Sequence, residues 1–472
     1  YSLIYTGARE KEDKGAFWRM NKEQGYHLEP SVGLLNDPNG LVFYKGIYHV
    51  FFQWNRFEKN HSYKEWGHFT SKDLVKWKRE RSALLPDQPY ERNGVYSGSA
   101  CVKNGRLYLY YTGNDKSGGI RKSSQCLAVT EDGKTFIKKG IILATPSAFT
   151  EYFRDPKVWK TENGYYMVIG AQKKDGQGAV ALCSSQDGEN WNYDRILAET
   201  KQYEMIECPD FFKIDGQKIL VYCLQHRDNE KDTSQESFTV YKNILFDEEK
   251  NQEVQDLDEG CRRLDQGFDF YAPQTFEIPD GRRILFAWMS RMNDEEEKKF
   301  SQGEKSIHCM TLPREISYKN GELCQMPIKE LEERLCEYEH SQKCFAPEGM
   351  TLEKRTYCVK LEKNSGSFMV SFQDGEVVIN YEQEEGLLKV RRKSWVSEGQ
   401  EERICEIGQL ENMEVWSDVS STEIFVNGGT RVFSMRNFPE SEYGKIKITG
   451  ELNEASVKVY DIPVEKEEQY EQ

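Results

Sequence analysis

Three acidic residues stand in short turn-like motifs spread over the first half of the chain. They are Asp37 in Leu-Leu-Asn-Asp-Pro-Asn-Gly, Asp155 in Phe-Arg-Asp-Pro and Glu207 in Glu-Cys-Pro-Asp. Each motif opens a similar run of strand-forming residues, so the three carboxylates are expected at equivalent places in a repeated architecture. Where such places converge, carboxylates can cleave a glycosidic bond, one acting as acid and base and another as nucleophile or water activator.

The motifs head the units of a repeat. In the first unit the acidic motif is followed by three strand-forming runs, at 41–44, 48–53 and 66–73. Later units begin near residues 97, 154, 207 and 271, with Asn-Gly or Asp-Gly hairpin signals inside them. Units of about four strands, at a period of roughly 45 to 60 residues, are typical of propeller blades. The first strand of each blade lines the central channel, whereas a pair of β-sandwiches would not explain the recurring polar motif.

The pattern changes after the fifth unit, and 472 residues are more than one ordinary core is expected to serve. A short helix or linker follows Pro327, and from residue 345 onward evenly spaced short strands alternate with turns. We therefore predict an all-β protein with a five-bladed β-propeller followed by a C-terminal β-sandwich. Its parts are an N-terminal extension at 1–26, the propeller at 27–325, a linker at 326–344 and the sandwich at 345–472.

Composition and charge narrow the class of partner. Charged residues make up 30% of the chain and hydrophobic residues 38%, which is typical of a globular protein. The formal net charge of −15 disfavours binding to nucleic acid or to anionic membranes. A small-molecule sugar is the expected partner, and the oligomeric state stays open.

The twelve cysteines indicate a reducing compartment. They include no Cys-x-x-Cys pair, and most lie in apolar strand-like runs, as expected for buried thiols in a cytoplasmic protein. No zinc-ligand spacing is present, and we expect neither a metal nor an organic cofactor. Nothing near Tyr1 resembles a signal peptide, and no apolar run is long enough to span a bilayer.

An ordered set of motifs extends over nearly the whole chain. Its members are Tyr26-His27-Leu28, Gly33 to Gly40, Gln53, Trp66-Gly67-His68, Tyr96-Ser97-Gly98-Ser99, Arg154-Asp155-Pro156, Glu207-Cys208-Pro209-Asp210, Phe270 to Gln274, Thr311 to Glu315 and Ser420 to Gly428. The set resembles glycoside hydrolase family 32, which holds invertases, sucrose-6-phosphate hydrolases and fructan hydrolases. The resemblance implies the same propeller-plus-sandwich fold and a retaining β-fructofuranosidase activity.

The resemblance also implies a role for each acid. Asp37 would be the nucleophile at the anomeric carbon of fructose, and Glu207 would protonate the leaving oxygen and then activate water. Asp155 would hold fructose hydroxyls and stabilise the transition state. The further fructose contacts that it implies are Asn36, Gln53, Tyr96, Ser97 and Arg154.

Local chemistry suggests how the two reacting carboxyls differ. Double displacement needs an ionised nucleophile and a protonated acid at the same pH. The amides around Asp37 favour its charged form, whereas the apolar neighbours of Glu207 and the nearby carboxylates are expected to raise the pKa of Glu207.

Three alternatives to a sucrose-cleaving enzyme stay open. One is an inverting glycosidase of another five-bladed family, which the separation of Asp37 and Glu207 would distinguish, and the others are an exo-acting fructan hydrolase and a non-catalytic sugar-binding propeller. Leu34-Leu35 and His61 replace the Trp-Met and Trp of many secreted members, as in the bacterial branch that cleaves phosphorylated sucrose. A phosphate on the glucose unit needs cations at the rim, for which His226, Arg227 and Arg291 are candidates.

Overall fold

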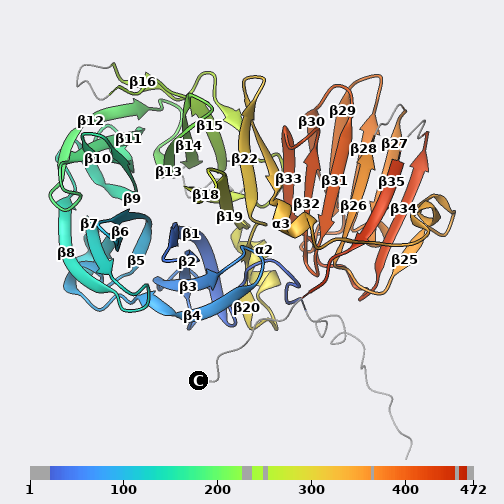
Figure 1. Ribbon diagram of the computed structural model, residues 1–472, viewed down its shortest axis with the longest axis horizontal. Helices are drawn as coiled ribbons and strands as arrows, with labels where there is room; N and C mark the ends of the chain where they lie inside the picture. The colour runs from blue at the N-terminus through green and yellow to red at the C-terminus, as the bar shows by residue number, and fades with distance from the viewer. Residues whose placement is uncertain (1–21, 226–236, 248–252, 363–365, 452–455, 465–472) are drawn as a thin grey trace, which may run out of the picture.

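The computed structural model describes residues 22–225, 237–247, 253–362, 366–451 and 456–464. Figure 1 shows two β domains side by side, a ring of sheets coloured blue to yellow and a two-layered stack of orange and red strands. The predicted all-β fold, a five-bladed propeller followed by a β-sandwich, is confirmed. No helix within these ranges is long and apolar enough to cross a membrane.

The first three blades follow one another along the chain. Blade 1 contains β1 (Gly33–Tyr44), β2 (Ile47–Asn55), β3 (Glu65–Ser71) and β4 (Trp77–Leu84), with β20 (Ser306–Ile307) parallel to β1. Blade 2 contains β5 (Val95–Lys103), β6 (Arg106–Asp115), β7 (Lys122–Thr130) and β8 (Ile137–Ala144). Blade 3 contains β9 (Phe149–Thr161), β10 (Gly164–Lys173), β11 (Gly178–Ser185), β12 (Asn192–Glu199) and the short β16 (Gln255–Asp256).

Blades 4 and 5 complete the ring. Blade 4 contains β13 (Met205–Ile214), β14 (Gln217–Gln225), β15 (Phe238–Asn243) and β17 (Arg262–Arg263). Blade 5 contains β18 (Tyr271–Glu277), β19 (Arg283–Met289), β22 (Arg314–Lys319) and β23 (Glu322–Pro327), with β21 (Cys309–Met310) on β19. The short helices are η2 (Pro89–Glu91), η3 (Ser117–Gly119), α2 (Asp294–Phe300), α3 (Lys329–Glu332), η4 (Ser341–Phe345) and η5 (Gln373–Gly375).

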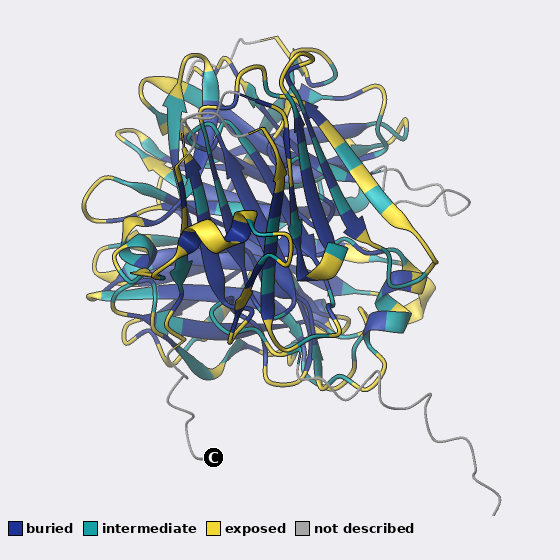
Figure 2. Cartoon of the chain, turned by 90° about the vertical axis from the view of Figure 1, so that its right-hand side faces the viewer, coloured by how far each residue is buried: buried dark blue, intermediate teal, exposed yellow. Residues whose placement is uncertain are grey.

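The sandwich consists of two six-stranded sheets. One has the order β24 (Cys336–Glu337), β35 (Ser456–Asp461), β26 (Tyr357–Glu362), β31 (Asn412–Ser417), β32 (Ser421–Val426) and β33 (Arg431–Arg436). The other has the order β25 (Met350–Leu352), β34 (Gly444–Gly450), β27 (Phe368–Phe372), β28 (Val377–Glu382), β29 (Leu387–Lys393) and β30 (Gln400–Glu406). Figure 2 shows mostly buried strands and exposed residues concentrated in the loops.

Local sequence explains the hairpins. Asn104 and Gly105, which join β5 to β6, have φ values of 51° and 73°, and Asp215 and Gly216, which join β13 to β14, have φ values of 47° and 77°. Two consecutive residues with positive φ form the type I′ turn, which matches the twist of antiparallel strands. The predicted Asn-Gly and Asp-Gly turns therefore set the register of these strand pairs.

The innermost strand of every blade carries a bulge at its polar motif. Pairing with the second strand skips residues between Leu35 and Pro38 in β1, between Tyr96 and Gly98 in β5 and between Glu207 and Asp210 in β13. The same break falls at Asp155-Pro156 in β9 and at Ala272-Pro273 in β18. Proline has no N–H for the ladder, so an X-Pro pair inside a strand favours such a break. The bulges re-aim side chains at the axis.

Polar contacts next to these bulges connect the inner strands of different blades. Gln274 of blade 5 donates to the Gly98 carbonyl of blade 2 (2.8 Å) and accepts from the Leu41 amide of blade 1 (3.1 Å). Lys157 of blade 3 contacts Asp210 of blade 4 at 3.0 Å. The ring is thus held together at its centre.

A buried histidine joins the propeller to the sandwich. His27 Nδ1 lies 2.8 Å from Asp418 and Nε2 lies 2.8 Å from Glu423, and all three side chains are fully buried. With a carboxylate at each ring nitrogen the imidazole is doubly protonated. Burial lowers the pKa of His27, but the hydrogen bonds to Asp418 and Glu423 outweigh it and raise the pKa to about 9.

The raised pKa of His27 predicts a loss of stability at alkaline pH. Because the folded pKa of about 9 exceeds the ordinary value of 6.5, the stabilisation is complete below pH 6.5 and is lost as pH rises through 9. In the wild type we expect the unfolding free energy to fall by on the order of 3 kcal/mol between these pH values. In His27→Gln this fall should be absent. Urea unfolding at several pH values measures it. Loss of the same pH dependence in His340→Gln, which changes an exposed histidine, would contradict the assignment.

Candidate active site

The three predicted acids meet at the propeller axis. The Cys208 amide donates to Asp155 Oδ2 at 3.0 Å, and the Cys208 thiol lies 3.5 Å from Asp155 Oδ2 and 3.7 Å from Asp37 Oδ2. Glu207 directly precedes Cys208 in β13. Blades 1, 3 and 4 therefore bring one carboxylate each to the same small space.

Asp37 is held by neighbours from two blades. Ser97 Oγ donates to Asp37 Oδ2 at 2.5 Å, and Asn36 Nδ2 donates to Oδ1 at 3.2 Å. Burial raises the pKa of Asp37, and the charge of Glu207 adds to this, so that the hydrogen bonds from Ser97 and Asn36 compensate only in part.

Asp155 is the most deeply placed of the acids. Its amide donates to Thr112 Oγ1 at 3.0 Å, and its φ of 67° lies in the left-handed region. Burial raises the pKa of Asp155 to about 7, with Arg154 opposing the shift and Glu207 and Asp37 adding to it.

Glu207 faces cationic and hydroxyl donors. Arg154 Nη2 donates to Glu207 Oε1 at 2.6 Å, and the Tyr271 hydroxyl donates to Oε2 at 2.8 Å. Burial alone would raise the pKa of Glu207, but Arg154, Arg291 and Tyr271 bring it below its ordinary value. The expectation that Glu207 carries the raised pKa and Asp37 the favoured charge is therefore wrong for this structure. The groups that lower the pKa of Glu207 come from other blades and not from the residues that flank it in the chain.

The predicted sugar-binding residues lie around this group of acids. Asn36 and Ser97 contact Asp37, and Arg154 contacts Glu207. Gln53 is buried and donates to the Val95 carbonyl at 3.1 Å, at the start of the strand that carries Ser97. Tyr96 pairs with Thr112 directly before the register break, which falls at Ser97, and it adds to the effect of Glu207 and Asp155 in raising the pKa of Arg154.

The rim candidates differ in what the structure says of them. Arg291 stacks its guanidinium over the Tyr271 ring at 5.2 Å, and its Nε is buried with no hydrogen-bond partner among the described residues. Its φ of 143° is one that residues with side chains rarely adopt, and such strain concentrates at functional sites. His226 and Arg227 lie outside the described residues.

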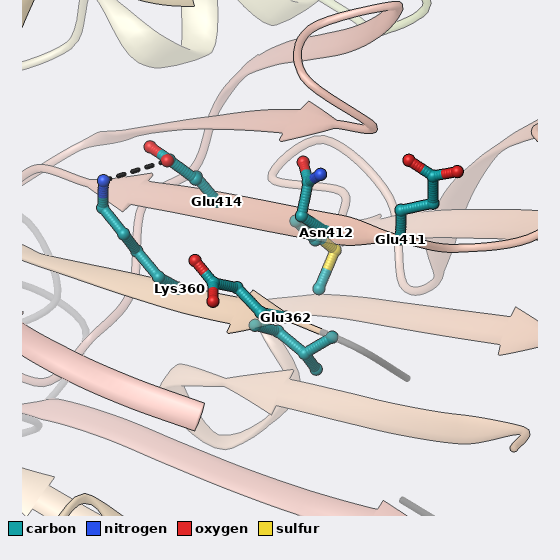
Figure 3. Close-up of a pocket in the computed structure, with 7 residues that line it drawn as sticks. Lys360, Glu362, Glu411, Asn412 and Glu414 are labelled. Carbon is teal, nitrogen blue, oxygen red and sulfur yellow. Dashed lines mark hydrogen bonds and ion pairs between the residues drawn. The ribbon is translucent and has the colours of Figure 1, made fainter. Parts of the chain in front are cut away.

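A pocket on the sandwich is also lined by carboxylates, but it differs chemically from the site on the propeller axis. Figure 3 shows Lys360 of β26 pointing to Glu414 of β31, and this ion pair measures 2.9 Å. Lys360 also contacts Glu332 at 3.1 Å. The pKa of Lys360 is raised, because these carboxylates outweigh burial. In the sandwich pocket a lysine neutralises two carboxylates, whereas on the axis the like charges of three acids lie close together.

Comparisons with known proteins identify the family of this chain. The model of the glycosyl hydrolases family 32 N-terminal domain matches residues 27–327, and that of the family 32 C-terminal domain matches residues 347–464. The chain belongs to glycoside hydrolase family 32. The predicted family is thereby confirmed.

Relatives of this family 32 chain cover nearly its full length. It is 39% identical over 431 residues to the sucrose-6-phosphate hydrolase of Bacillus subtilis, covering 88% of this chain and 89% of that protein. The solved sucrose-6-phosphate hydrolase of Lactobacillus gasseri superposes with a TM-score of 0.82 at 27% identity, covering 95% of each chain. A family 32 β-fructofuranosidase of Bombyx mori superposes with a TM-score of 0.78 at 28% identity, covering 93% of this chain and 94% of that one.

Sequence reasoning missed several residues of this family 32 site. Tyr271 contacts Glu207, and its place at the head of the fifth unit was a usable signal. Thr112 lies within an ordinary second strand and is completely buried, and no local pattern distinguishes it. Lys64 stands in a polar loop, where a lysine indicates exposure, yet it is only 5% exposed.

The crowding of carboxylates predicts that Asp155→Asn stabilises the fold while it impairs turnover. Because the folded pKa of about 7 exceeds the ordinary 3.8, ionised Asp155 destabilises the fold increasingly from pH 4 to pH 7. We expect the variant to gain roughly 2 kcal/mol or more at pH 8 and nothing near pH 4. It should lose about a hundredfold or more in kcat.

Denaturant titrations at pH 4 and pH 8 measure the gain in stability from Asp155→Asn. Asp215→Asn is a matched control, because exposed Asp215 also has a positive φ, of 47°. An equal gain in both variants would mean that backbone preference, and not charge crowding, is responsible.

Proposed function

We propose that this family 32 enzyme is a retaining β-fructofuranosidase that hydrolyses the fructosyl bond of sucrose and of sucrose 6-phosphate. The observation that carries the proposal is the meeting of Asp37, Asp155 and Glu207 on the axis, with Arg154 and Tyr271 on Glu207. Relatives named sucrose-6-phosphate hydrolase, aligned over about nine tenths of the chain, support the substrate class.

In the proposed reaction each of these groups has one role. Asp37 attacks the anomeric carbon of the fructosyl unit while the bond to the glucose oxygen breaks, and Glu207 gives its proton to that oxygen. Ionised Glu207 then takes a proton from water, which attacks the same carbon and releases Asp37 and fructose. Asp155, next to both, accepts hydrogen bonds from fructose hydroxyls as positive charge develops on the ring.

An acid catalyst must be protonated, but in the free site the pKa of Glu207 lies below its ordinary value. In the proposed reaction, sugar binding raises it. Arg154 Nη1 is buried without a hydrogen-bond partner among the described residues, so it is available to a sugar hydroxyl. A bound sugar excludes water from the site, and this further desolvation raises the pKa of Glu207. Glu207 is then protonated while Asp37, which keeps the Ser97 hydrogen bond, attacks.

The two roles predict different responses to a better leaving group. Asp37→Asn should abolish turnover of all substrates, because the amide that replaces the carboxylate cannot form the covalent intermediate. Glu207→Gln should reduce kcat/KM for sucrose by about 100-fold or more, yet spare an aryl β-fructofuranoside whose phenolate leaves unprotonated. Glu162→Gln, at an exposed position, is the control. Equal losses on both substrates in Glu207→Gln would exclude Glu207 as the acid.

Double displacement predicts the anomer that forms first. Two inversions at one carbon give net retention, so β-fructose should precede its mutarotation product. NMR spectra recorded in the first minutes of sucrose hydrolysis distinguish the anomers. Initial α-fructose would support the inverting alternative, and no release of fructose at all would support a sugar-binding propeller without catalysis.

Arg291 is the described cation best placed for a phosphate on the leaving glucose. It stacks on Tyr271, whose hydroxyl contacts Glu207, so it stands on the leaving-group side of the acid. A net charge of −15 opposes a dianionic sugar unless local cations outweigh it. The strained backbone and unpaired Nε of Arg291 support this role.

Kinetics with both sugars test the role of Arg291. Charge-assisted hydrogen bonds worth on the order of 1.5 to 3 kcal/mol each should lower KM for sucrose 6-phosphate about tenfold or more relative to sucrose. Arg291→Met should remove most of this preference, and added salt should weaken it in the wild type. Arg106→Met, at an exposed arginine paired with Glu131, should leave it unchanged. Equal kcat/KM for the two sugars in the wild type would indicate an invertase.

A cytoplasmic location completes the proposal. All twelve cysteines are free thiols in the structure, and burial raises the pKa of the thiols inside the strands, such as Cys126, Cys183 and Cys223. Thiols persist in a reducing compartment. Such a compartment is also where a sugar phosphorylated during uptake is met.

A further inference from the structure

A buried lysine lies beside the proposed nucleophile. Lys64 directly precedes β3 and is only 5% exposed, and its ammonium group donates to Asn36 Oδ1. The other end of that amide, Asn36 Nδ2, donates to Asp37 Oδ1 at 3.2 Å. An amide bound by a cation at its oxygen cannot flip, so its N–H₂ group stays directed at the carboxylate.

Lys64 has a second partner that leads away from the axis. Its ammonium group lies 2.8 Å from His61 Nδ1, and His61 Nε2 lies 3.6 Å from Glu297 Oε2. An ammonium group has only donors, so Nδ1 accepts and Nε2 carries the hydrogen that faces Glu297. His308 Nε2 contacts the same Glu297 oxygen at 3.1 Å. The two histidines hold the pKa of Glu297 below its ordinary value against the effect of burial.

Glu297 is positioned by the sandwich. It lies in α2, which begins after Asn293 with a capping box formed by Asn293 and Glu296. Trp395 Nε1, from the sandwich, donates to the Glu296 carbonyl at 3.2 Å. Phe300 at the end of α2 stacks on Phe438 with ring centroids 4.5 Å apart. One side of α2 therefore rests on the C-terminal domain, and Glu297 extends toward His61.

We propose that Lys64 is a positioning residue of the reaction, locked by His61 and Glu297, which orients Asn36 and supplies the positive charge that keeps Asp37 ready to attack. This inference rests on the proposed function, because it assigns Asp37 as the nucleophile. It also gives the sandwich a part in the reaction, since the sandwich supports α2 and α2 carries Glu297.

The charges around these groups decide the sign of the effect. Asp37 faces Glu207, Asp155, Lys64 and the Cys208 thiol, and Lys64 faces Asp37, His61 and Glu297. Lys64 lowers the pKa of Asp37, and Asp37 and Glu297 in turn raise that of Lys64, although burial brings it to about 8. Without Lys64, the pKa of the nucleophile rises.

The bell-shaped pH profile of kcat/KM tests the proposal. The midpoint between its two limbs depends on the pKa values of the coupled carboxyls Asp37, Asp155 and Glu207 together, whichever group titrates first. Removing a nearby cation raises a carboxyl pKa by about 1 unit or more, so Lys64→Met should move the midpoint up by about half a unit or more. At pH 6, kcat/KM for sucrose should fall about tenfold. Lys64→Arg, which keeps the charge, should return the midpoint toward that of the wild type.

Lys360→Met is the matched control, because it removes a lysine from an ion pair in the sandwich (Figure 3). It should lower the melting temperature without moving the midpoint.

If Lys64→Met does not fold, Glu297→Gln decides, since it removes the charge that holds His61 while keeping the side-chain shape. An upward shift of the midpoint in Glu297→Gln supports the proposal. An active wild type with an unmoved midpoint in the folded variant overturns the role of Lys64 alone. A wild type inactive on both sugars overturns the proposed function and this role together.

Discussion

The burial of three carboxylates in one small space is the constraint on which the rest of this structure depends. Like charges brought together away from water cost free energy, and the pKa of Asp155 at about 7 is the direct sign of that cost. Arg154 provides the main compensation, because its guanidinium binds Glu207 and its charge opposes the shift at Asp155. Arg154 and Asp155 belong to blade 3 and Glu207 to blade 4, so compensation requires the two blades to keep a fixed spacing. The bond from Lys157 to Asp210, just beneath the acids, maintains it.

The bulges explain how an ordinary antiparallel sheet delivers such a site. A regular strand alternates its side chains between the two faces of the sheet, whereas a reactive carboxylate must point along the central channel. The X-Pro pairs of blades 1, 3, 4 and 5 interrupt the ladder where this change of direction is needed, and Asp155, Cys208 and Ala272 take positive φ values there. Register shifts also occur between outer strands of blades 1, 2 and 3, but those at the X-Pro pairs of blades 1, 3 and 4 are the ones that coincide with the acidic motifs.

The sandwich is bound to the propeller through buried charge rather than through apolar packing alone. Arg314 of blade 5 donates to Glu423 (Nε to Oε2, 2.9 Å) and to Asp265 (3.2 Å), and Glu423 also accepts from His27. Removing one member of such a network leaves an uncompensated buried charge, so the domains are held in one orientation. That orientation places the sandwich against α2. A domain without proposed catalytic residues thereby acts on the site through Glu297.

The sequence by itself determined the features that depend on neighbours in the chain. The Asn104-Gly105 turn, the alternation in the sandwich strands and the acidic motifs at the head of each unit are local, and they were sufficient for the fold and for bringing Asp37, Asp155 and Glu207 to one axis. Only the tertiary structure decided which carboxyl carries the raised pKa, because Arg154 reaches Glu207 from another blade. It alone showed that Lys64 is buried, since a lysine in a polar loop gives no local sign of its surroundings. Desolvation and charge act through space, and the distances that govern them exist only once residues remote in the chain have been packed together.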